Sequence, residues 1–431
     1  MHAYTVRAAN LDLTGLGLEY LPQEIGKLEH LEYLDLSHNQ LKELPCEMAC
    51  LKNLKKLFLT KNDFTEFPDV VGKLASLEMF SIKSNKIASI GCSQNIPSAV
   101  NWLILTDNRI QELPDDFGTH LPLIRKLAMS GNCLKELPAS FGNLTQLELV
   151  RLSNNRIERI PDMLIALPRL AWVALGGNPV TNNLSDRNAA LQQLEKLKLD
   201  FSDFTLGECI GSGASGNVYT ASSVSCSGKQ YALKMFKEIS SDGLPEDELA
   251  VCSAVACAGD IPSGLIPVSG WFERPRIGLS MEYIEQASPL AGVPSLESIT
   301  RDIYSAHAEY SLKTAVNILL HCAKALEYIH EKHVSHGDFY AHNILIQHND
   351  TPRLGDWGAS FFYPPEYALF EKIEVLSFGF LIEELNQRLE NNPHPSLSAL
   401  AGQCAQMNVS ARPAFSEIVV TLEQIGSLYY N

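Results

Sequence analysis

The chain has 431 residues, of which 45% are hydrophobic and 19% are charged. This composition excludes a mostly disordered chain, a collagen-like chain and a small disulfide scaffold, and the length suits two or three domains. The net charge of −16 excludes a nucleic-acid binder that works by bulk attraction to phosphate. Residues 1–200 carry 21 basic and 23 acidic side chains, whereas residues 201–431 carry 13 and 27, which mildly favours a basic partner for the second half.

Three features of the chain predict a cytoplasmic protein without a membrane span. No run of about 18 apolar residues is present to cross a bilayer. Residues 1–7 lack the charged and then apolar layout of a signal peptide. The ten cysteines form no CxxC pair, and in a chain of this length we expect them to be reduced and mostly buried.

A repeat of about 23 residues fills the first part of the chain. Asparagines recur at intervals of 23 or 24 residues, at Asn39, Asn62, Asn85, Asn108, Asn132, Asn155 and Asn178. Each follows an apolar frame of the type Leu-x-x-Leu-x-Leu-x-x-Asn, and an earlier copy begins at Leu11, which makes about eight units. The alternation predicts one short strand in each copy, stacked on its neighbours as a parallel sheet. The asparagine amides are expected to satisfy backbone groups where the chain leaves each strand. The pattern resembles leucine-rich repeats of intracellular proteins.

The strand positions that alternate with this core are expected to lie exposed on the concave face. They include Tyr33, Asp35, Phe58, Met79, Trp102, Ile104, Lys126, Arg151 and Trp172. Phe58, Trp102 and Ile104 fall on adjacent or next-adjacent repeats, and this aromatic group indicates a surface for a protein partner. A plain surface or a contact between domains is the alternative interpretation.

The periodicity ends after Pro179, where a linker is expected. Ser185 and Asp186 predict the cap of a helix that runs to Leu197 and closes the end of the repeat core. The predicted domains are a leucine-rich-repeat solenoid at 1–180, a capping helix and linker at 181–202, and a catalytic domain at 203–431.

The second half contains glycines at the spacing of a phosphate-binding loop. A G-x-G-x-x-G-x-V pattern is formed by Gly211, Gly213, Gly216 and Val218. Glycines allow a backbone to approach phosphate closely, but a dinucleotide-binding loop shares them. The pattern lacks the lysine of a Walker A loop. The chain then continues as a strand instead of a helix, and a second strand ends in Lys234, which favours the loop of a kinase.

A lysine on the buried side of a sheet requires a counter-charge. Residues 246–254 predict a helix with one apolar face, and Glu248 is the expected partner of Lys234. Glu246 is the alternative, and a solvated acidic first turn is the remaining interpretation.

The segment from His336 to Asn343 carries the strongest chemical signal. It contains Asp338 after a histidine, and Asp356 follows eighteen residues later in a D-x-G context. Phosphoryl transfer requires one carboxylate that accepts the hydroxyl proton, and an amide and a second carboxylate that hold Mg²⁺ against the phosphates. Asp338, Asn343 and Asp356 supply these groups in the required order.

With these motifs in series, residues 204–425 resemble the eukaryotic-like protein kinase catalytic domain. Together with its repeats, the chain resembles cytosolic leucine-rich-repeat protein kinases of bacterial type. The resemblance implies an α/β leucine-rich-repeat solenoid followed by a bilobal α+β protein-kinase-like domain. It implies ATP and Mg²⁺ as cofactors, Asp338 as the catalytic base, and Asn343 and Asp356 as metal ligands. Lys234, paired with Glu248, would hold the α- and β-phosphates.

The resemblance also assigns a hinge and a late ion pair. The strand over 279–284 resembles the kinase hinge, so backbone groups of Glu282 and Ile284 would bind adenine, with Met281 behind the base. Glu366 and Arg412 occupy the positions of a glutamate and an arginine that pair in the family.

The chain departs from the kinase pattern at four points. Gly337 replaces the arginine that usually grips a phosphorylated activation loop, and Tyr340 replaces the lysine typical of serine/threonine kinases. Eight positions separate Gly358 from Glu366, so the activation segment is short. Glu374 stands where an aspartate usually supports the catalytic loop.

Three functions are compatible with these residues. The first is an active protein kinase, with serine and threonine as the expected acceptors, gated by its repeats or constitutively assembled. The second is a kinase-like phosphotransferase for a small molecule, and the third is an ATP-binding pseudokinase scaffold. The retained catalytic residues disfavour the third, and the fused repeats favour a protein substrate over the second. The choice between serine/threonine and tyrosine stays open because Tyr340 occupies the position that usually reports it.

Overall fold

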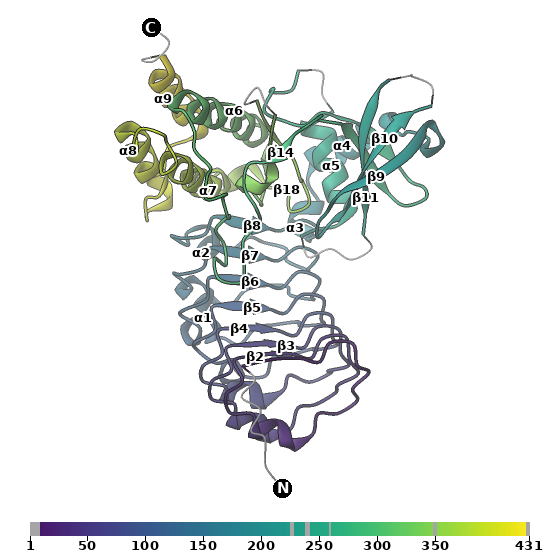
Figure 1. Cartoon of the computed structure of the whole chain (residues 1–431), viewed down its shortest axis with the longest axis vertical. Coiled ribbons are helices and arrows are strands. Elements are labelled where there is room, and N and C mark those ends of the chain that lie inside the picture. The colour runs from purple at the N-terminus through teal and green to yellow at the C-terminus, as the bar shows by residue number, and fades with distance from the viewer. Residues whose placement is uncertain (1–8, 225–227, 238–241, 258–259, 348–350, 428–431) are drawn as a thin grey trace. The chain divides into compact units, whose positions relative to one another are not determined.

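A computed structural model of the chain describes residues 9–224, 228–237, 242–257, 260–347 and 351–427 (Figure 1). Residues 1–7, considered above for a signal peptide, lie outside the described residues. The chain forms two compact units, Met1–Arg169 and Leu170–Asn431. Each unit has its own architecture.

The first unit is a stack of short strands that pair in parallel and in chain order. They are β1 (Asn10–Asp12), β2 (Tyr33–Asp35), β3 (Lys56–Phe58), β4 (Met79–Ser81), β5 (Trp102–Ile104), β6 (Lys126–Ala128) and β7 (Leu149–Arg151). The chain returns through one helical turn in each repeat. These turns are η1 (Gln23–Lys27), η2 (Cys46–Cys50), η3 (Asp69–Lys73), η4 (Ser93–Asn95), α1 (Phe117–His120), η5 (Ala139–Asn143) and α2 (Asp162–Ile165). The predicted repeat architecture is therefore confirmed.

The recurring asparagines form a ladder of hydrogen bonds along this unit. Asn62 donates from Nδ2 to the carbonyl oxygens of Leu36 at 3.0 Å and Leu59 at 3.2 Å. Its Oδ1 accepts from the backbone N–H of Leu41 at 3.0 Å. The amides of the asparagines from Asn39 to Asn155 in this series join neighbouring repeats in the same way, and leaving such a group unpaired when buried would cost about 1–3 kcal/mol. The predicted role of the asparagines is confirmed.

The strand positions predicted to be exposed are more covered than expected. Met79, Arg151 and Trp172 are buried, so the prediction is wrong for these three. The remaining six are half-buried: Tyr33, Asp35, Phe58, Trp102, Ile104 and Lys126. Adjacent strands lie only about 4.8 Å apart, so large side chains on them pack on one another. The rings of Tyr33 and Phe58 are 5.4 Å apart, and Lys126 Nζ lies 4.1 Å from the Trp102 ring centroid.

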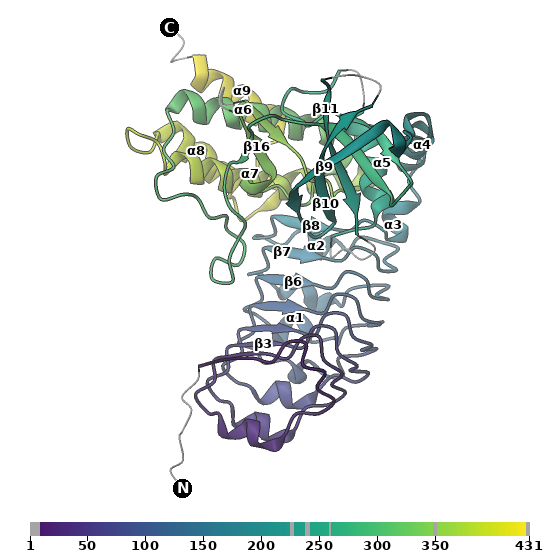
Figure 2. The same ribbon diagram turned by 45° about the vertical axis from the view of Figure 1, so that its right-hand side comes forward.

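The second unit begins with β8 (Trp172–Ala174), α3 (Pro179–Asn182), α4 (Ser185–Leu194) and η6 (Glu195–Leu197). The predicted helix is present, although Leu184 instead of Ser185 stands at its N-cap. Its buried face packs on α5 (Pro245–Val255), and the two helices lie side by side in Figures 1 and 2. The unit begins at Leu170, and Trp172 within it contacts Phe339 and Tyr340 of the catalytic domain.

The rest of the second unit has two lobes. After η7 (Phe201–Asp203), an antiparallel sheet has the order β12-β13-β11-β10-β9 and is accompanied by α5. Its strands are β9 (Phe204–Ser212), β10 (Gly216–Ser223), β11 (Gln230–Phe236), β12 (Val268–Phe272) and β13 (Gly278–Glu282). The second lobe is built on α6 (Leu312–His330), α7 (Leu369–Asn386), α8 (Pro395–Cys404) and α9 (Phe415–Ser427).

Short elements complete the helical lobe and carry its loops. They are β14 (Ser288–Pro289), β15 (Val334–Ser335), η8 (Ala341–Asn343), β16 (Ile344–Ile346), β17 (Pro352–Leu354), β18 (Phe361–Phe362), η9 (Pro365–Tyr367) and η10 (Val409–Ala411). Ser311 caps α6 by accepting the Thr314 N–H at 3.0 Å, which explains where the amphipathic helix begins. The predicted bilobal α+β domain is confirmed.

The described cysteines are free thiols, but the prediction that most are buried is wrong. Cys252, Cys322 and Cys404 are buried, whereas four others are exposed: Cys46, Cys50, Cys92 and Cys209. The exposed ones lie in the short turns of the repeats and at the edge of the sheet, where little packs over them. Within the described ranges, no helix has the length and apolar character that a membrane crossing requires.

Candidate active site

An ion-pair cluster lies at the centre of the second unit. Lys234 on β11 places Nζ 2.6 Å from Glu248 Oε1 on α5 and 2.9 Å from Asp356 Oδ1. Lys234 and Glu248 are buried, whereas about half of the Asp356 side chain is exposed. Glu246, the alternative partner considered from the sequence, is exposed. The ammonium group of Lys234 therefore joins the sheet, α5 and the D-x-G loop.

Lys234 and Asp356 stabilise each other's charged form, whereas burial raises the pKa of Glu248 to about 7. Burial lowers the pKa of Lys234, but the carboxylates of Asp356 and Glu248 outweigh it and hold that pKa above its ordinary value. The positive charge of Lys234 lowers the pKa of Asp356 to about 2. Asp356 therefore stays ionised at neutral pH, as a ligand for a cation must.

The glycine-rich segment forms the turn between β9 and β10. The Gly213 N–H donates to the Gly216 carbonyl oxygen at 2.9 Å, which closes the turn. A Cβ atom at Gly216 would lie 2.6 Å from the Met235 carbonyl oxygen, so glycine is required there. Gly211 and Val218 face each other across the β9–β10 ladder. The turn exposes Gly213, as a loop that approaches phosphate requires.

The segment expected to bind adenine lies at the end of β13. Met281 is half-buried and Glu282 is exposed. The Glu282 N–H donates to the Pro267 carbonyl oxygen at 2.9 Å, so this N–H is already paired within the protein. Ile284 is half-buried one residue beyond Tyr283.

The loop over 336–343 joins the predicted base to the predicted metal ligands. Asn343 Nδ2 donates to the Asp338 carbonyl oxygen at 2.9 Å, which leaves its amide oxygen as the atom that can bind a cation. His336 Nε2 lies 3.0 Å from the carbonyl oxygen of Gly355, which is the residue before Asp356. The catalytic loop and the D-x-G loop are therefore in contact. Asp338 is half-buried. An amide oxygen and an ionised carboxylate are ligands that suit Mg²⁺, so these residues fit a divalent cation.

Glu374 on α7 lies beneath this loop. Its Oε1 accepts from Ser335 Oγ at 2.9 Å and from the Gly337 N–H, and its Oε2 lies 2.7 Å from His330 Nε2. Burial raises the pKa of Glu374, but the hydrogen bond and charge of His330 outweigh it and hold that pKa below its ordinary value. The glutamate therefore contacts the loop from the position that the sequence assigned to it.

Two contacts differ from the sequence interpretation. His342 donates its backbone N–H to Asp302 at 3.0 Å, and its ring Nδ1 lies 2.7 Å from the same carboxylate, a contact that the sequence did not suggest. Arg412 donates to the carbonyl oxygens of Gln406 and Lys372, and Glu366 is exposed. Among the described residues no ion pair joins Glu366 to Arg412, so that expectation is wrong.

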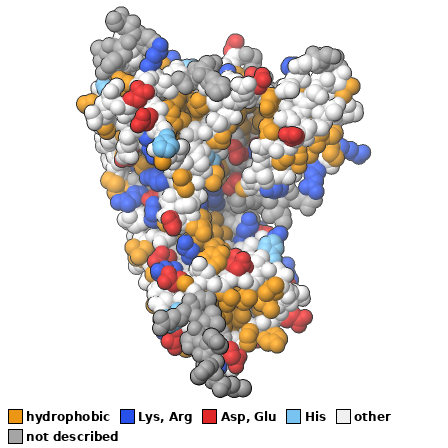
Figure 3. Space-filling view, viewed as in Figure 1, with side chains coloured by type: hydrophobic (Ala, Val, Ile, Leu, Met, Phe, Trp, Pro, Cys, Tyr) orange, Lys and Arg blue, Asp and Glu red, His pale blue; other side chains and the backbone are white. Residues whose placement is uncertain are grey.

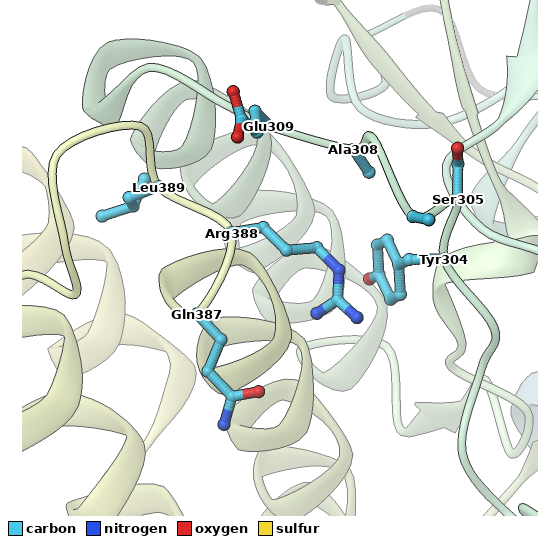
Figure 4. A pocket seen from close by; sticks show the side chains of 8 residues that line it. Tyr304, Ser305, Ala308, Glu309, Gln387, Arg388 and Leu389 are labelled. Atoms are coloured by element: carbon cyan, nitrogen blue, oxygen red, sulfur yellow. The ribbon is translucent and has the colours of Figure 1, made fainter.

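A separate pocket of about 400 Å³ lies at the end of α7 and contains none of the predicted site residues. It is lined by Tyr304, Ser305, Ala306, Ala308, Glu309, Gln387, Arg388 and Leu389. Figure 4 shows Arg388 pointing toward Tyr304, and its guanidinium carbon lies 4.0 Å from the ring centroid. This pocket is distinct from the candidate active site.

Comparisons with known families agree with this geometry. Residues 204–381 match the protein kinase domain, residues 9–96 match the leucine-rich repeat region, and residues 98–157 match the leucine rich repeat. The chain carries a protein kinase domain after a leucine-rich-repeat region. The kinase match begins at the first residue of β9 and ends within α7, so it includes every predicted site residue.

Curated relatives are similar to the kinase domain. A probable L-type lectin-domain containing receptor kinase of Arabidopsis thaliana is 31% identical over 208 residues, which is 42% of this chain and 29% of the relative. Aurora kinase B of Xenopus tropicalis is 27% identical over 191 residues, 43% of this chain and 48% of the relative. A probable inactive serine/threonine-protein kinase of Dictyostelium discoideum is 28% identical over 174 residues, 40% and 5% of the two chains. The chain thus spans less than half of each of these relatives.

Proposed function

We propose that the protein is an ATP- and Mg²⁺-dependent protein kinase that acts in the cytoplasm on serine or threonine hydroxyls. The observation that carries this proposal is the contact of Lys234 Nζ with both Glu248 and Asp356, at 2.6 Å and 2.9 Å. This contact aligns the sheet, α5 and the D-x-G loop as ATP binding requires. The free thiols of the described cysteines suit a reducing compartment.

Each site residue has a role in the proposed reaction. Lys234 would hold the α- and β-phosphates, and the backbone of Gly211, Gly213 and Gly216 would cover them. Asn343 and Asp356 would hold the Mg²⁺ ion, which supplies charge neutralisation of the phosphates when bound. Asp338 would accept the proton of the attacking hydroxyl.

Replacing Asp338 with asparagine tests the function directly. The amide keeps the size of the side chain but cannot accept the hydroxyl proton, so we expect phosphoryl transfer to fall about 10²–10⁴-fold. The affinity for ATP should change little, because Asp338 does not hold the nucleotide. The measurement is transfer of radiolabelled phosphate from ATP to a generic basic protein, with ATP binding measured separately.

The same assay separates the alternative functions. ATP hydrolysis or transfer to a small molecule without protein labelling would favour a small-molecule phosphotransferase. ATP binding without turnover would favour a pseudokinase scaffold, and wild-type rates in the Asp338→Asn variant would rule out the assigned base. A matched control is Glu390→Ala, which removes an exposed carboxylate after α7.

The activity is expected not to depend on phosphorylation of the activation segment. Ser360 and Tyr363 are buried: Ser360 Oγ donates to the His336 carbonyl oxygen at 2.8 Å, and the Tyr363 hydroxyl lies 2.9 Å from His330 Nδ1. A phosphate on either would break these contacts, and no Lys or Arg lies between Trp357 and Glu371 to pair with it. Phosphatase treatment should therefore leave the rate unchanged within about twofold. A loss of activity after treatment would contradict this prediction.

The repeat surface is proposed to bind a protein substrate or regulator. Its candidate contacts remain Phe58, Trp102 and Ile104, which are half-buried on β3 and β5. Hydrophobic side chains also gather on the face of the N-terminal repeats seen in Figure 3, and exposed Leu16 and Tyr20 belong to the first repeat. Such apolar surface is typical of protein-binding sites.

Replacing Trp102 with alanine should raise the KM for a protein substrate captured by the repeats about 10-fold, with little effect on a short peptide from that substrate. The melting temperature should change little, because the Trp102 ring packs on Lys126 and not in the repeat core. Leu123→Ala, at an exposed position of the same unit, is the control. Equal KM values for wild type and variant would exclude Trp102 from the binding surface.

A further inference from the structure

We infer that the segment from Trp172 to Leu194, which precedes the kinase domain, positions the active site by holding both the catalytic loop and α5. This inference rests on the proposed kinase function and adds positioning residues to it. The segment contains β8, α3 and α4, and all of it belongs to the second unit.

Trp172 on β8 fixes the backbone of the catalytic loop. Its Nε1–H donates to the carbonyl oxygen of Phe339, next to Asp338, at 2.8 Å. Its ring stacks on Tyr340 with centroids 4.3 Å apart and planes only 3° from parallel. Both rings are buried, so the tyrosine that replaces the usual kinase lysine is held against β8. A hydrogen bond and a stack on consecutive residues leave the loop little freedom beside the catalytic base.

Gly337 adjusts the loop to the same strand. Its φ of +73° is one that side chains disfavour, and a Cβ atom there would lie 2.5 Å from the carbonyl oxygens of Val173 and Ala359. The arginine expected at this position has no room, because the backbone of β8 passes there. Strand β8 thus contacts the catalytic loop at Gly337, the position at which most protein kinases have the arginine that binds a phosphorylated activation loop.

Helix α4 holds α5 through a buried ion pair. Arg187 donates from Nε and Nη2 to Asp247 Oδ1 at 3.1 and 2.9 Å, and both side chains are buried. Asp247 directly precedes Glu248, the partner of Lys234. One turn and a half further along α5, Ser253 Oγ donates to the Ala190 carbonyl oxygen at 2.8 Å. The two contacts fix both the N-terminal turn and the later part of the helix.

The same helix also contacts the sheet. Trp271 on β12 donates its Nε1–H to the Leu194 carbonyl oxygen at 2.9 Å. Ala190 and Leu194 belong to the apolar core that includes α5 and β12. Helix α4 therefore ties α5 to the sheet that carries Lys234.

The energetics of a buried ion pair favour a positioning role over a stabilising one. Removing two charges from water costs several kcal/mol, so a pair such as Arg187–Asp247 adds little net stability. Two N–H groups of Arg187 nevertheless converge on Asp247 Oδ1, whereas the buried Oδ2 has no hydrogen-bond partner among the described residues, so the pair depends on this one point of contact. Such a pair fixes one arrangement of two helices, and here one of those helices carries Glu248.

The two contact regions predict different kinetic defects, which a purely structural role would not produce. In the full-length chain, Trp172→Phe keeps a ring for stacking but loses the N–H donor, so kcat should fall about 10-fold with the KM for ATP unchanged. Arg187→Gln loosens α5 and thereby Lys234, so the KM for ATP should rise about 10-fold. Arg187→Lys keeps the charge and should recover part of the affinity for ATP.

Lys324→Met is the matched control, because it breaks an exposed ion pair between Lys324 and Glu423 in the same unit. It should leave both parameters unchanged. The inference is wrong if Trp172→Phe and Arg187→Gln both show wild-type kinetics, or if each variant loses kcat and ATP affinity only in proportion to its unfolded fraction. If Arg187→Gln does not fold, Trp172→Phe decides the matter, and wild-type kinetics in that variant overturns the inference. A wild-type chain that neither binds nor turns over ATP would overturn the proposed function itself.

Discussion

Replacing Asp356 with alanine is expected to lower ATP turnover about 10³-fold and to remove the dependence of ATP binding on Mg²⁺. The carboxylate is the one ionised oxygen donor of the D-x-G loop, and Lys234 lowers its pKa to about 2. Alanine leaves Asn343 as the remaining assigned ligand, and an amide alone cannot compensate the charge of the cation. Several kcal/mol of charge stabilisation are lost in this way, which corresponds to a rate about 10³-fold lower.

The fold should survive this substitution. About half of the Asp356 side chain is exposed, so little buried surface is lost. Lys234 loses one acceptor but keeps Glu248 at 2.6 Å, so the buried cation remains paired. The measurement is ATP affinity by calorimetry with and without Mg²⁺, beside a melting curve. Mg²⁺-dependent binding of wild-type strength by the Asp356→Ala variant would contradict the assignment, and Asp356→Asn separates the charge from the shape.

The residues of the active site could be predicted because each acts within a short segment. The glycines, Asp338 with Asn343, and the D-x-G loop are separated by spacings that the chemistry of phosphoryl transfer imposes. Glu248 could be chosen over Glu246 as the partner of Lys234 from the apolar face that follows it, and the structure pairs these residues. The asparagine ladder was predictable for the same reason, since each repeat has the same local geometry.

The contacts that position the site could not be read from the sequence. Trp172 and Phe339 are 167 positions apart, and Arg187 and Asp247 are 60 apart, so no local spacing links them. The alternation of residues in β8 predicts which side chains point away from the repeat core. It does not predict that Tyr340 covers one of these side chains, Trp172. Trp172 therefore looked like an exposed residue, although it is 2% exposed in the structure. Gly337 gave the available signal, because a glycine in place of a long side chain indicates that a backbone passes close by.

Glu374→Ala should be among the most destabilising substitutions in the second unit. It removes the acceptor shared by His330, Ser335 and the Gly337 N–H, all of which are buried. Each buried polar group left unpaired costs about 1–3 kcal/mol, so the free energy of unfolding should fall by about 3–5 kcal/mol. That is a large share of the about 5–15 kcal/mol that holds a typical protein folded.

The pH dependence of stability tests the charge of Glu374 apart from its shape. The folded state holds the pKa of Glu374 below its ordinary value, chiefly through His330 acting against burial. A lowered carboxyl pKa contributes stability that is complete above the ordinary value and is lost as the pH falls through the lowered one. Urea unfolding of the wild type should therefore show lower stability toward acidic pH, and Glu374→Gln should weaken this dependence.

A small effect of Glu374→Ala would contradict the expected loss of stability. The expectation is wrong if the free energies of unfolding of this variant and of the wild type differ by less than about 1 kcal/mol at neutral pH, because substitution of an ordinary residue has an effect of that size. Glu374→Asp provides the conservative comparison: its shorter side chain keeps the charge but cannot reach His330 and the Gly337 N–H together, so its stability should lie between those of the wild type and Glu374→Ala.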